Sequence, residues 1–253
     1  MDINRLNEVN AEDIDLSSFE IKKKLHPKMW VNGKMNPRVR LRLLKIVNDF
    51  IKKLKINPIY WEDTLLLGSL TNYNWSKYSD IDLHVLIDFK KIDDDVVFVK
   101  DYFDDKRKLW NLEHVRLRIY GFPVEIYIQD INEENASNGI YSIEKDMWIK
   151  KPSHQNKTFN RKKVKLKSSD IMTIIDDLCD KHENITSIED LEYTSEIVKR
   201  MFDKIKRMRK NGLNSREGEF SMGNIIFKVL RRSGYITKLI EIKRDTYDKI
   251  NSI

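Results

Sequence analysis

The chain has 253 residues, of which 40% are hydrophobic, so it is long enough for one large domain or two modest domains with real cores. No apolar run approaches the roughly 20 residues that cross a bilayer. The first twenty residues, MDINRLNEVNAEDIDLSSFE, are acidic and polar, unlike the apolar region of a secretory leader. These features predict a globular, soluble, cytoplasmic protein with no membrane partner. The single cysteine, Cys179, excludes an internal disulfide, and its apolar helical surroundings indicate a small core residue.

The formal net charge of +7 is unevenly distributed along the sequence. Residues 151–253 contain 23 Lys and Arg against 15 Asp and Glu, whereas residues 1–150 contain 24 against 25. Such an imbalance fits a polyanionic partner such as nucleic acid. The Lys-rich and Ile-rich composition of a chain from an AT-rich genome gives the same imbalance without any such partner, so both readings stay open.

Hydrophobic periodicity predicts mixed helices and strands in the first part of the chain. Asn36 followed by Pro37 is typical of a helix start, and the apolar residues after it repeat at helical spacing. The expected elements, in chain order, are a helix over Arg38–Lys55, strands over Thr64–Leu67 and Ile81–Ile87, a helix over Asp93–Trp110, and a hairpin over residues 115–129 with Gly121 and Pro123 at its turn.

After a basic stretch from Lys150 to Lys167, only helical patterns remain. They cover Ser169–His182, Ile188–Lys210, a segment around Phe220–Arg232, and Tyr235 to the C-terminus. We therefore expect an α/β (α+β) fold: a small mixed β-sheet with flanking helices in residues 1–150, a basic connector in residues 151–168, and a helical bundle in residues 169–253.

The strand predicted over Ile81–Ile87 carries acids on one face. A period of two places Asp80, Asp82 and His84 on one side and the apolar residues on the other. Two carboxylates about 7 Å apart repel each other, which favours solvent, a cationic partner or a bridging divalent metal such as Mg²⁺. Glu125 joins this acidic face if its own strand pairs beside the first.

These residues, in this order, resemble a known signature. Leu67-Gly68-Ser69, ten further residues, Asp80-Ile81-Asp82-Leu83 and a later strand acid are similar to the signature of the DNA polymerase β-like nucleotidyltransferase superfamily. The resemblance implies that Gly68 allows close backbone approach at a helix start and that Ser69 donates to a phosphate oxygen. It also implies that Asp80 and Asp82 hold two Mg²⁺ (or Mn²⁺) ions, with Glu125 as the third carboxylate. Many relatives carry Asp where this chain has the longer Glu125.

Three further segments look like parts of uncharacterised nucleotidyltransferase-like proteins of tailed bacteriophages. They are VEIYIQD, NGIYSIEKDMWIKKP and GEFSMGNIIFKVLRRSGY, and together they extend the resemblance over most of the chain. This second resemblance implies an origin in a phage-infected host cell, and it brings no substrate.

Several other polar residues have both a functional and an ordinary interpretation. His84 either touches phosphate or metal or is a buried, hydrogen-bonded histidine. Lys77 either meets a triphosphate or is a solvated loop lysine. The cations Lys150, Lys151, Arg161, Lys162 and Lys163 suit a nucleic-acid backbone or a plain connector, while Arg231 and Arg232 are candidate triphosphate ligands.

The resemblance implies transfer of a nucleoside monophosphate from a nucleoside triphosphate to an acceptor hydroxyl, with release of pyrophosphate. The basic second half favours an RNA 3′ end as acceptor. Nucleotidylation of a protein or small molecule, as in AMPylation, is the rival within the enzyme class. A catalytically silent nucleic-acid-binding module is the alternative from another class, and the intact set of three mutually repelling acids argues against it.

Overall fold

The structure, a computed structural model, describes residues 9–56, 61–155 and 157–252. Two compact units divide the chain. The sheet unit spans Glu20–Asn156, and the helical unit combines Met1–Phe19 with Lys157–Ile253. Among the described residues, no helix is both long enough and apolar enough to cross a membrane.

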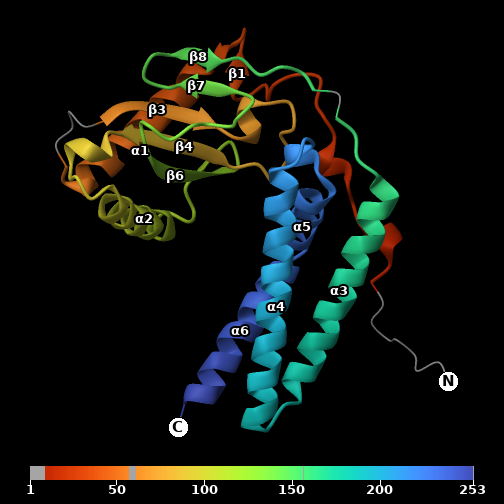
Figure 1. The fold of residues 1–253 in the computed structure, drawn as a ribbon. Coiled ribbons are helices and arrows are strands. Elements are labelled where there is room, and N and C mark those ends of the chain that lie inside the picture. The colour runs from red at the N-terminus through yellow and green to blue at the C-terminus, as the bar shows by residue number, and fades with distance from the viewer. Residues whose placement is uncertain (1–8, 57–60, 156, 253) are drawn as a thin grey trace. The chain divides into compact units, whose positions relative to one another are not determined.

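The sheet unit is built on a six-stranded mixed sheet (Figure 1). Its strands lie in the order β5-β6-β4-β3-β7-β8, and β4 and β6 are parallel while the other neighbours are antiparallel. The bounds are β1 Trp30–Val31, β2 Lys34–Met35, α1 Pro37–Leu54, β3 Trp61–Leu67, β4 Ile81–Ile87, α2 Val96–Glu113, β5 Arg118–Ile119, β6 Phe122–Asp130, β7 Ile140–Ser142 and β8 Met147–Lys150. The expected mixed α/β fold is confirmed.

Helices α1 and α2 cover one face of this sheet. The side chain of Asn36 accepts from the backbone N–H of Arg38 and caps α1, as the Asn-Pro pair predicts. Buried residues of both helices share a core with alternate residues of β4 and β6: Val39, Leu43, Val47, Phe50, Phe103, Trp110, Ile81, Leu83, Val85, Val124 and Ile126. Because strand side chains alternate, Asp82 and His84 on β4 and Glu125 on β6 lie on the opposite face.

The hairpin expected over residues 115–129 is present, with a different turn. Arg118 pairs with Pro123 and Ile119 with Phe122. Tyr120 and Gly121 form the two-residue turn, both with positive φ (51° and 89°). Pro123 therefore lies in β6 rather than in the turn. It pairs there with Arg118 of the edge strand β5, near the start of β6 and before the pairing with β4 begins at Val124.

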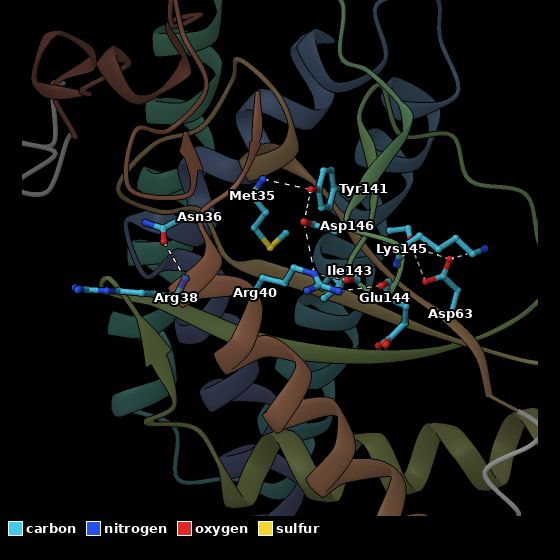
Figure 2. A network of polar contacts seen from close by, with 11 residues as sticks. Met35, Asn36, Arg38, Arg40, Asp63, Tyr141, Ile143, Glu144, Lys145 and Asp146 are labelled. Atoms are coloured by element: carbon cyan, nitrogen blue, oxygen red, sulfur yellow. Dashed lines mark hydrogen bonds and ion pairs between the residues drawn. The ribbon is translucent and has the colours of Figure 1, made fainter. Parts of the chain in front are cut away.

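A polar network fastens the β7–β8 hairpin to the start of α1 (Figure 2). Arg40 donates from Nε to the carbonyl of Ile143 at 2.7 Å and from Nη2 to that of Glu144 at 2.9 Å. The hydroxyl of Tyr141 donates to Asp146 Oδ1 at 2.7 Å and lies 3.3 Å from the backbone N of Met35. Burial and the bond to Asp146 raise the pKa of Tyr141 to about 12, so this hydroxyl keeps its proton.

The helical unit consists of α3 Arg161–Glu183, α4 Ile188–Leu213, α5 Met222–Arg232 and α6 Tyr235–Asn251. Helix α3 begins eight residues before the expected start at Ser169, because the side chain of Asn160 accepts from the backbone N–H of Lys163 and caps it. Part of the basic stretch is therefore helix rather than connector. Near the N-terminus, Val9 N donates to Thr173 Oγ1 at 3.2 Å, and Lys165 Nζ donates to the carbonyl of Glu12 at 2.7 Å.

This packing of the N-terminal segment removes the charge imbalance seen along the sequence. The acids of residues 9–19 belong to the same unit as the basic C-terminal helices. Over the described residues, the helical unit has 22 Lys and Arg against 18 Asp and Glu, and the sheet unit has 24 against 20. Each unit thus carries a formal charge of +4, and the excess of positive charge does not single out the helical unit.

Candidate functional site

Three carboxylates meet on the face of the sheet opposite α1 and α2. Asp80, Asp82 and Glu125 each offer an oxygen, and these oxygens all lie within 4.8 Å of one another. Asp80 directly precedes β4, and Asp82 is paired in register with Glu125 on the parallel neighbour β6. The two aspartates are half-buried and Glu125 is exposed. The structure thus brings together the three acids that the sequence placed on one face.

Gly68 directly follows β3, beside this cluster. Its neighbour Leu67 is paired with Asp82, and Gly68 has φ of +80°. A Cβ at this position would lie 2.3 Å from Asp82 Oδ2, a distance that real Cβ atoms do not show. A larger residue would therefore have to displace this carboxylate, and the positive φ also favours glycine. The close approach to a phosphate that the resemblance implies stays a prediction.

The turn after Gly68 is shorter than the resemblance implies. Ser69–Thr71 is a single three-residue 3₁₀ turn, not the start of an α-helix. A helix dipole therefore contributes little here, because it needs several aligned peptide units. The hydroxyl of Ser69 lies 2.7 Å from that of Ser79, which also accepts from Ser76 N at 3.0 Å. Ser69 is thereby fixed at the turn, next to the acids.

In the loop between Ser69 and Asp80, Trp75 packs against a segment about 50 residues earlier in the chain. Trp75 donates from Nε1 to the carbonyl of Lys24 at 2.9 Å, and its ring lies edge-on to His26 at 4.6 Å. Lys77 is exposed, and its ammonium lies 5.1 Å from the ring centre of Tyr78. Trp75 is thus a packing residue, whereas Lys77 remains accessible to a ligand.

His84 lies on the acidic face, one row beyond Asp82. Its ring stacks on Tyr127 with centroids 5.2 Å apart, and its Nδ1 lies 2.8 Å from Gln129 Oε1. The guanidinium of Arg107 covers Tyr127 at 3.9 Å. Burial lowers the pKa of His84, while the bond to Gln129 acts in the opposite direction. These contacts match the interpretation of His84 as a hydrogen-bonded, largely buried histidine.

The candidate basic residues divide between the two units. Lys150 ends β8 and donates from Nζ to the carbonyl of Ser137 at 2.9 Å, and Lys151 follows it in the sheet unit. Arg161, Lys162 and Lys163 form the exposed first turn of α3 in the helical unit. Arg231 and Arg232 end α5, where Arg232 donates to Ser18 Oγ at 2.7 Å. Their contact with a ligand stays a prediction.

Two residues of the site escaped the sequence reasoning. Thr71 Oγ1 lies 2.8 Å from the carbonyl of Gly68 and 2.9 Å from that of Gly139, and so joins the turn to the loop before β7. A Cβ at Gly139 would lie 2.1 Å from the Thr71 carbonyl. Asn138-Gly139 is a turn signal in the sequence, but its partner lies 68 residues away and no local pattern indicates that pairing.

The donor set of this site fits a divalent cation of the magnesium type. All three candidate ligands are carboxylates, and oxygen ligands are those that Mg²⁺ and Mn²⁺ prefer. Carboxylate oxygens so close together repel one another, and a shared cation relieves that repulsion. Gly68 lies so close to one of these ligands that an added Cβ would be 2.3 Å from Asp82 Oδ2. Asp80, Asp82 and Glu125 are thus the residues that would hold the metal.

Comparisons with known proteins add little to this geometry. No family model matches the chain, and no curated protein matches it. A match among solved structures is the STING-associated CdnE c-di-GMP synthase from Capnocytophaga granulosa, with 14% sequence identity over 88% of this chain and 90% of that chain. The TM-score is 0.23, which is too low to support a conclusion about fold or activity.

Proposed function

We propose that the chain is a metal-dependent nucleotidyltransferase that moves a nucleoside monophosphate from a nucleoside triphosphate to an acceptor hydroxyl and releases pyrophosphate. The observation that carries the proposal is the meeting of the three carboxylates with the Gly68 turn. Asp82 and Glu125 are register partners on parallel strands, and Gly68 approaches Asp82 so closely that an added Cβ would displace its carboxylate. A merely structural cluster has no need for three mutually repelling acids.

The residues of the site have separate roles in this reaction. Asp80, Asp82 and Glu125 would hold a divalent cation, which would supply positive charge against the charge that develops on the phosphate oxygens. Asp80 and Asp82 would keep the cation in position. Glu125 is the most exposed of the three acids and faces the acceptor hydroxyl. The Ser69 hydroxyl and the backbone of the Gly68–Ser69 turn orient the triphosphate, and Lys77 pairs with its outer oxygens. Positioning and charge neutralisation account for most of the rate enhancement.

The activity is tested by incubating the purified protein with each α-labelled nucleoside triphosphate, Mg²⁺ or Mn²⁺, and total RNA and protein from a bacterial host. We expect label in a metal-dependent product together with released pyrophosphate. Asp82→Asn is the matched control, because it changes one oxygen to nitrogen and keeps the side-chain volume. No transfer to any fraction, or equal transfer by Asp82→Asn, would refute the proposal.

For the acceptor we propose an RNA 3′ hydroxyl. Its support is local: Arg161, Lys162 and Lys163 crowd three exposed cations into the first turn of α3, next to Lys157 and Lys165. The logarithm of the affinity for a single strand falls linearly with the logarithm of the salt concentration, with a slope of roughly 0.7 per neutralised phosphate. Replacing the three residues by Ser should therefore lower the salt slope of RNA binding by about two units.

The matched control removes three exposed cations from α4 in the same unit, as Lys204→Ser, Arg207→Ser and Lys210→Ser. This variant has the same net charge, so a specific path along α3 predicts little change in its salt slope. An unchanged affinity in the α3 variant, with label found in protein or small molecules, would favour nucleotidylation of such an acceptor. RNA binding without any transfer would favour the silent binding module.

A further inference from the structure

A groove with a volume of about 940 Å³ lies in the sheet unit, bordered by α1, the C-terminal end of α2 and the β5–β6 hairpin. Its volume falls within the range of small-molecule sites, roughly 300–1,000 Å³. The floor is apolar and is formed by Val39, Ile46, Trp110, Leu117 and Ile119. None of these residues belongs to the acid cluster or to the turn beside it.

The groove and the acid cluster belong to opposite faces of the sheet. Val39 and Trp110 are core residues of α1 and α2, which cover the face that carries Ile81 and Leu83. Asp82 and Glu125 alternate with those core residues along their strands and point the other way. A ligand in the groove therefore cannot touch the three carboxylates, and its binding does not depend on the proposed transfer reaction.

Positive charge dominates the rim of the groove. Four cations line it, Arg38, Arg42, Lys45 and Arg118, against the single carboxylate of Asp49. That carboxylate is paired with Lys45 at 2.6 Å. Arg38 is exposed, and Figure 2 shows its side chain pointing away from the network around Arg40. The rim thus offers guanidinium groups, whose planar forks suit a phosphate or carboxylate.

Flat rings accompany these cations. His114 stacks on Trp110 with centroids 3.9 Å apart and planes at 21°, and both line the groove. Tyr120, also a lining residue, stands at the tip of the β5–β6 turn with 46% of its surface exposed. Aromatic rings beside an apolar floor suit a flat ring system, and guanidinium groups at the rim suit its anionic substituent.

The edge of the sheet argues against an extended peptide as the occupant. Addition of a strand needs a long row of free backbone groups, and affinity in that mode comes from main-chain hydrogen bonds. The edge strand β5, which lines the groove, is only two residues long. A compact ligand therefore matches the groove better than a strand does.

We propose that this groove is a second ligand site, which binds a nucleoside phosphate with its base over the apolar floor and its phosphate at Arg38 and Arg42. The site lies away from the acid cluster and holds none of its carboxylates. Bound nucleotide there is an effector or a stored ligand rather than the donor of the transfer reaction.

The test uses the full chain with Asp80→Asn and Asp82→Asn, in EDTA, so that metal-dependent binding at the acid cluster does not contribute. The probe is mant-AMP, followed by fluorescence anisotropy. We expect saturable binding, weakened at least about tenfold by Arg38→Glu with Arg42→Glu, since two charge-assisted contacts are lost. The control, Lys34→Glu with Lys90→Glu, reverses two exposed cations of the same unit outside the groove and should bind like the parent.

Competition separates the parts of the ligand. Unlabelled AMP should displace the probe at concentrations at least about tenfold below those needed for adenosine or inorganic phosphate alone, because base and phosphate both contribute. Absence of mant-AMP binding, or equal weakening in both charge-reversed variants, overturns the proposal. Displacement by inorganic phosphate as readily as by AMP overturns the base contact, and displacement only by an acidic Leu/Glu peptide assigns the groove to a protein partner.

Discussion

Two aspartates on neighbouring strands of the same sheet have opposite surroundings. Asp63 on β3 is 3% exposed, and its carboxylate accepts from Ser142 Oγ at 2.8 and 2.9 Å and from Thr64 N at 2.8 Å. Lys145 Nζ adds an ion pair at 3.1 Å. Asp82 on β4 is half-buried and shares its space with the oxygens of Asp80 and Glu125. The Asp63 carboxylate is held by hydroxyl, N–H and ammonium donors, whereas the Asp82 carboxylate lies close to two other carboxylates.

The difference distinguishes an acid whose partners lie within the fold from a cluster of acids whose mutual repulsion a cation would relieve. Removal of a buried carboxylate that several donors satisfy destabilises the fold, because those donors are left without an acceptor. Like charges gathered at one point cost free energy, which a bound cation recovers. We therefore expect opposite results: replacing Asp63 lowers the free energy of unfolding, whereas replacing Asp80 or Asp82 lowers only the transfer activity.

The largest expected effect is loss of activity in the acid cluster. Asp80→Asn and Asp82→Asn should each lower kcat for nucleotidyl transfer at least about a hundredfold. Mutation of the groups that only hydrogen-bond to metal ligands already lowers metal affinity or activity by about 10–100-fold. The free energy of unfolding should stay the same or rise slightly, because carboxylate repulsion is removed. Transfer assays and urea denaturation measure the two quantities. A strongly destabilised Asp82→Asn would place Asp82 in the same class as Asp63.

The second effect tests the other half of the comparison. Asp63→Ala should lower the free energy of unfolding by about 2–4 kcal/mol, because it leaves the Ser142 hydroxyl and the Thr64 N–H without their buried acceptor. The ion pair to Lys145 adds little, since that lysine is 61% exposed. Chemical denaturation measures the change. A loss below about 0.5 kcal/mol would show that the carboxylate is dispensable to the fold.

The sequence predicted one of these acids and not the other, for a physical reason. Asp80 and Asp82 alternate with apolar residues within a single strand, so a local pattern reveals their face. Asp63 depends on Ser142, 79 residues away, and Arg40 on Ile143, 103 residues away. No periodicity encodes such pairs. Glu125 is an intermediate case. Alternation along its strand predicts its face, but its position beside Asp82 depends on the parallel pairing of β4 and β6.

Tertiary contacts also explain why the basic run and the charge distribution differ from what the sequence predicted. The basic run over residues 151–168 was interpreted as a connector that either contacts nucleic acid or only joins the domains, yet the cap at Asn160 starts α3 within it. The charge count by sequence halves placed the acids of the N-terminal segment in the first half, but this segment packs with the C-terminal helices. Both required knowledge of tertiary partners. Helix α1 and strands β3 and β4, whose hydrophobic patterns are strong and local, were predicted close to their observed bounds.

The third prediction tests how closely the Gly68 backbone approaches the Asp82 carboxylate. Gly68 and Gly33 have nearly the same φ, +80° and +79°, but a Cβ at Gly33 meets nothing within 4 Å. Gly33→Ala should therefore cost only the backbone strain of about 1 kcal/mol. Gly68→Ala should cost about 1–2 kcal/mol more and also lower kcat, because the methyl group displaces Asp82. Equal losses of stability in the pair, with full activity, would show that Asp82 moves aside freely.

The smallest effect concerns Ser69, whose hydroxyl either contacts the triphosphate or only holds the loop. Ser69→Ala should raise KM for the triphosphate about five- to tenfold with little change in kcat, since one phosphate hydrogen bond is worth about 1–1.5 kcal/mol. Ser79→Ala is the discriminating control, because it removes the 2.7 Å partner of Ser69 and keeps the Ser69 hydroxyl. Direct contact predicts a smaller rise of KM in Ser79→Ala than in Ser69→Ala. Equal rises would mean that Ser69 acts by fixing the loop, and the site would then recognise the triphosphate through the backbone of the turn and its cations.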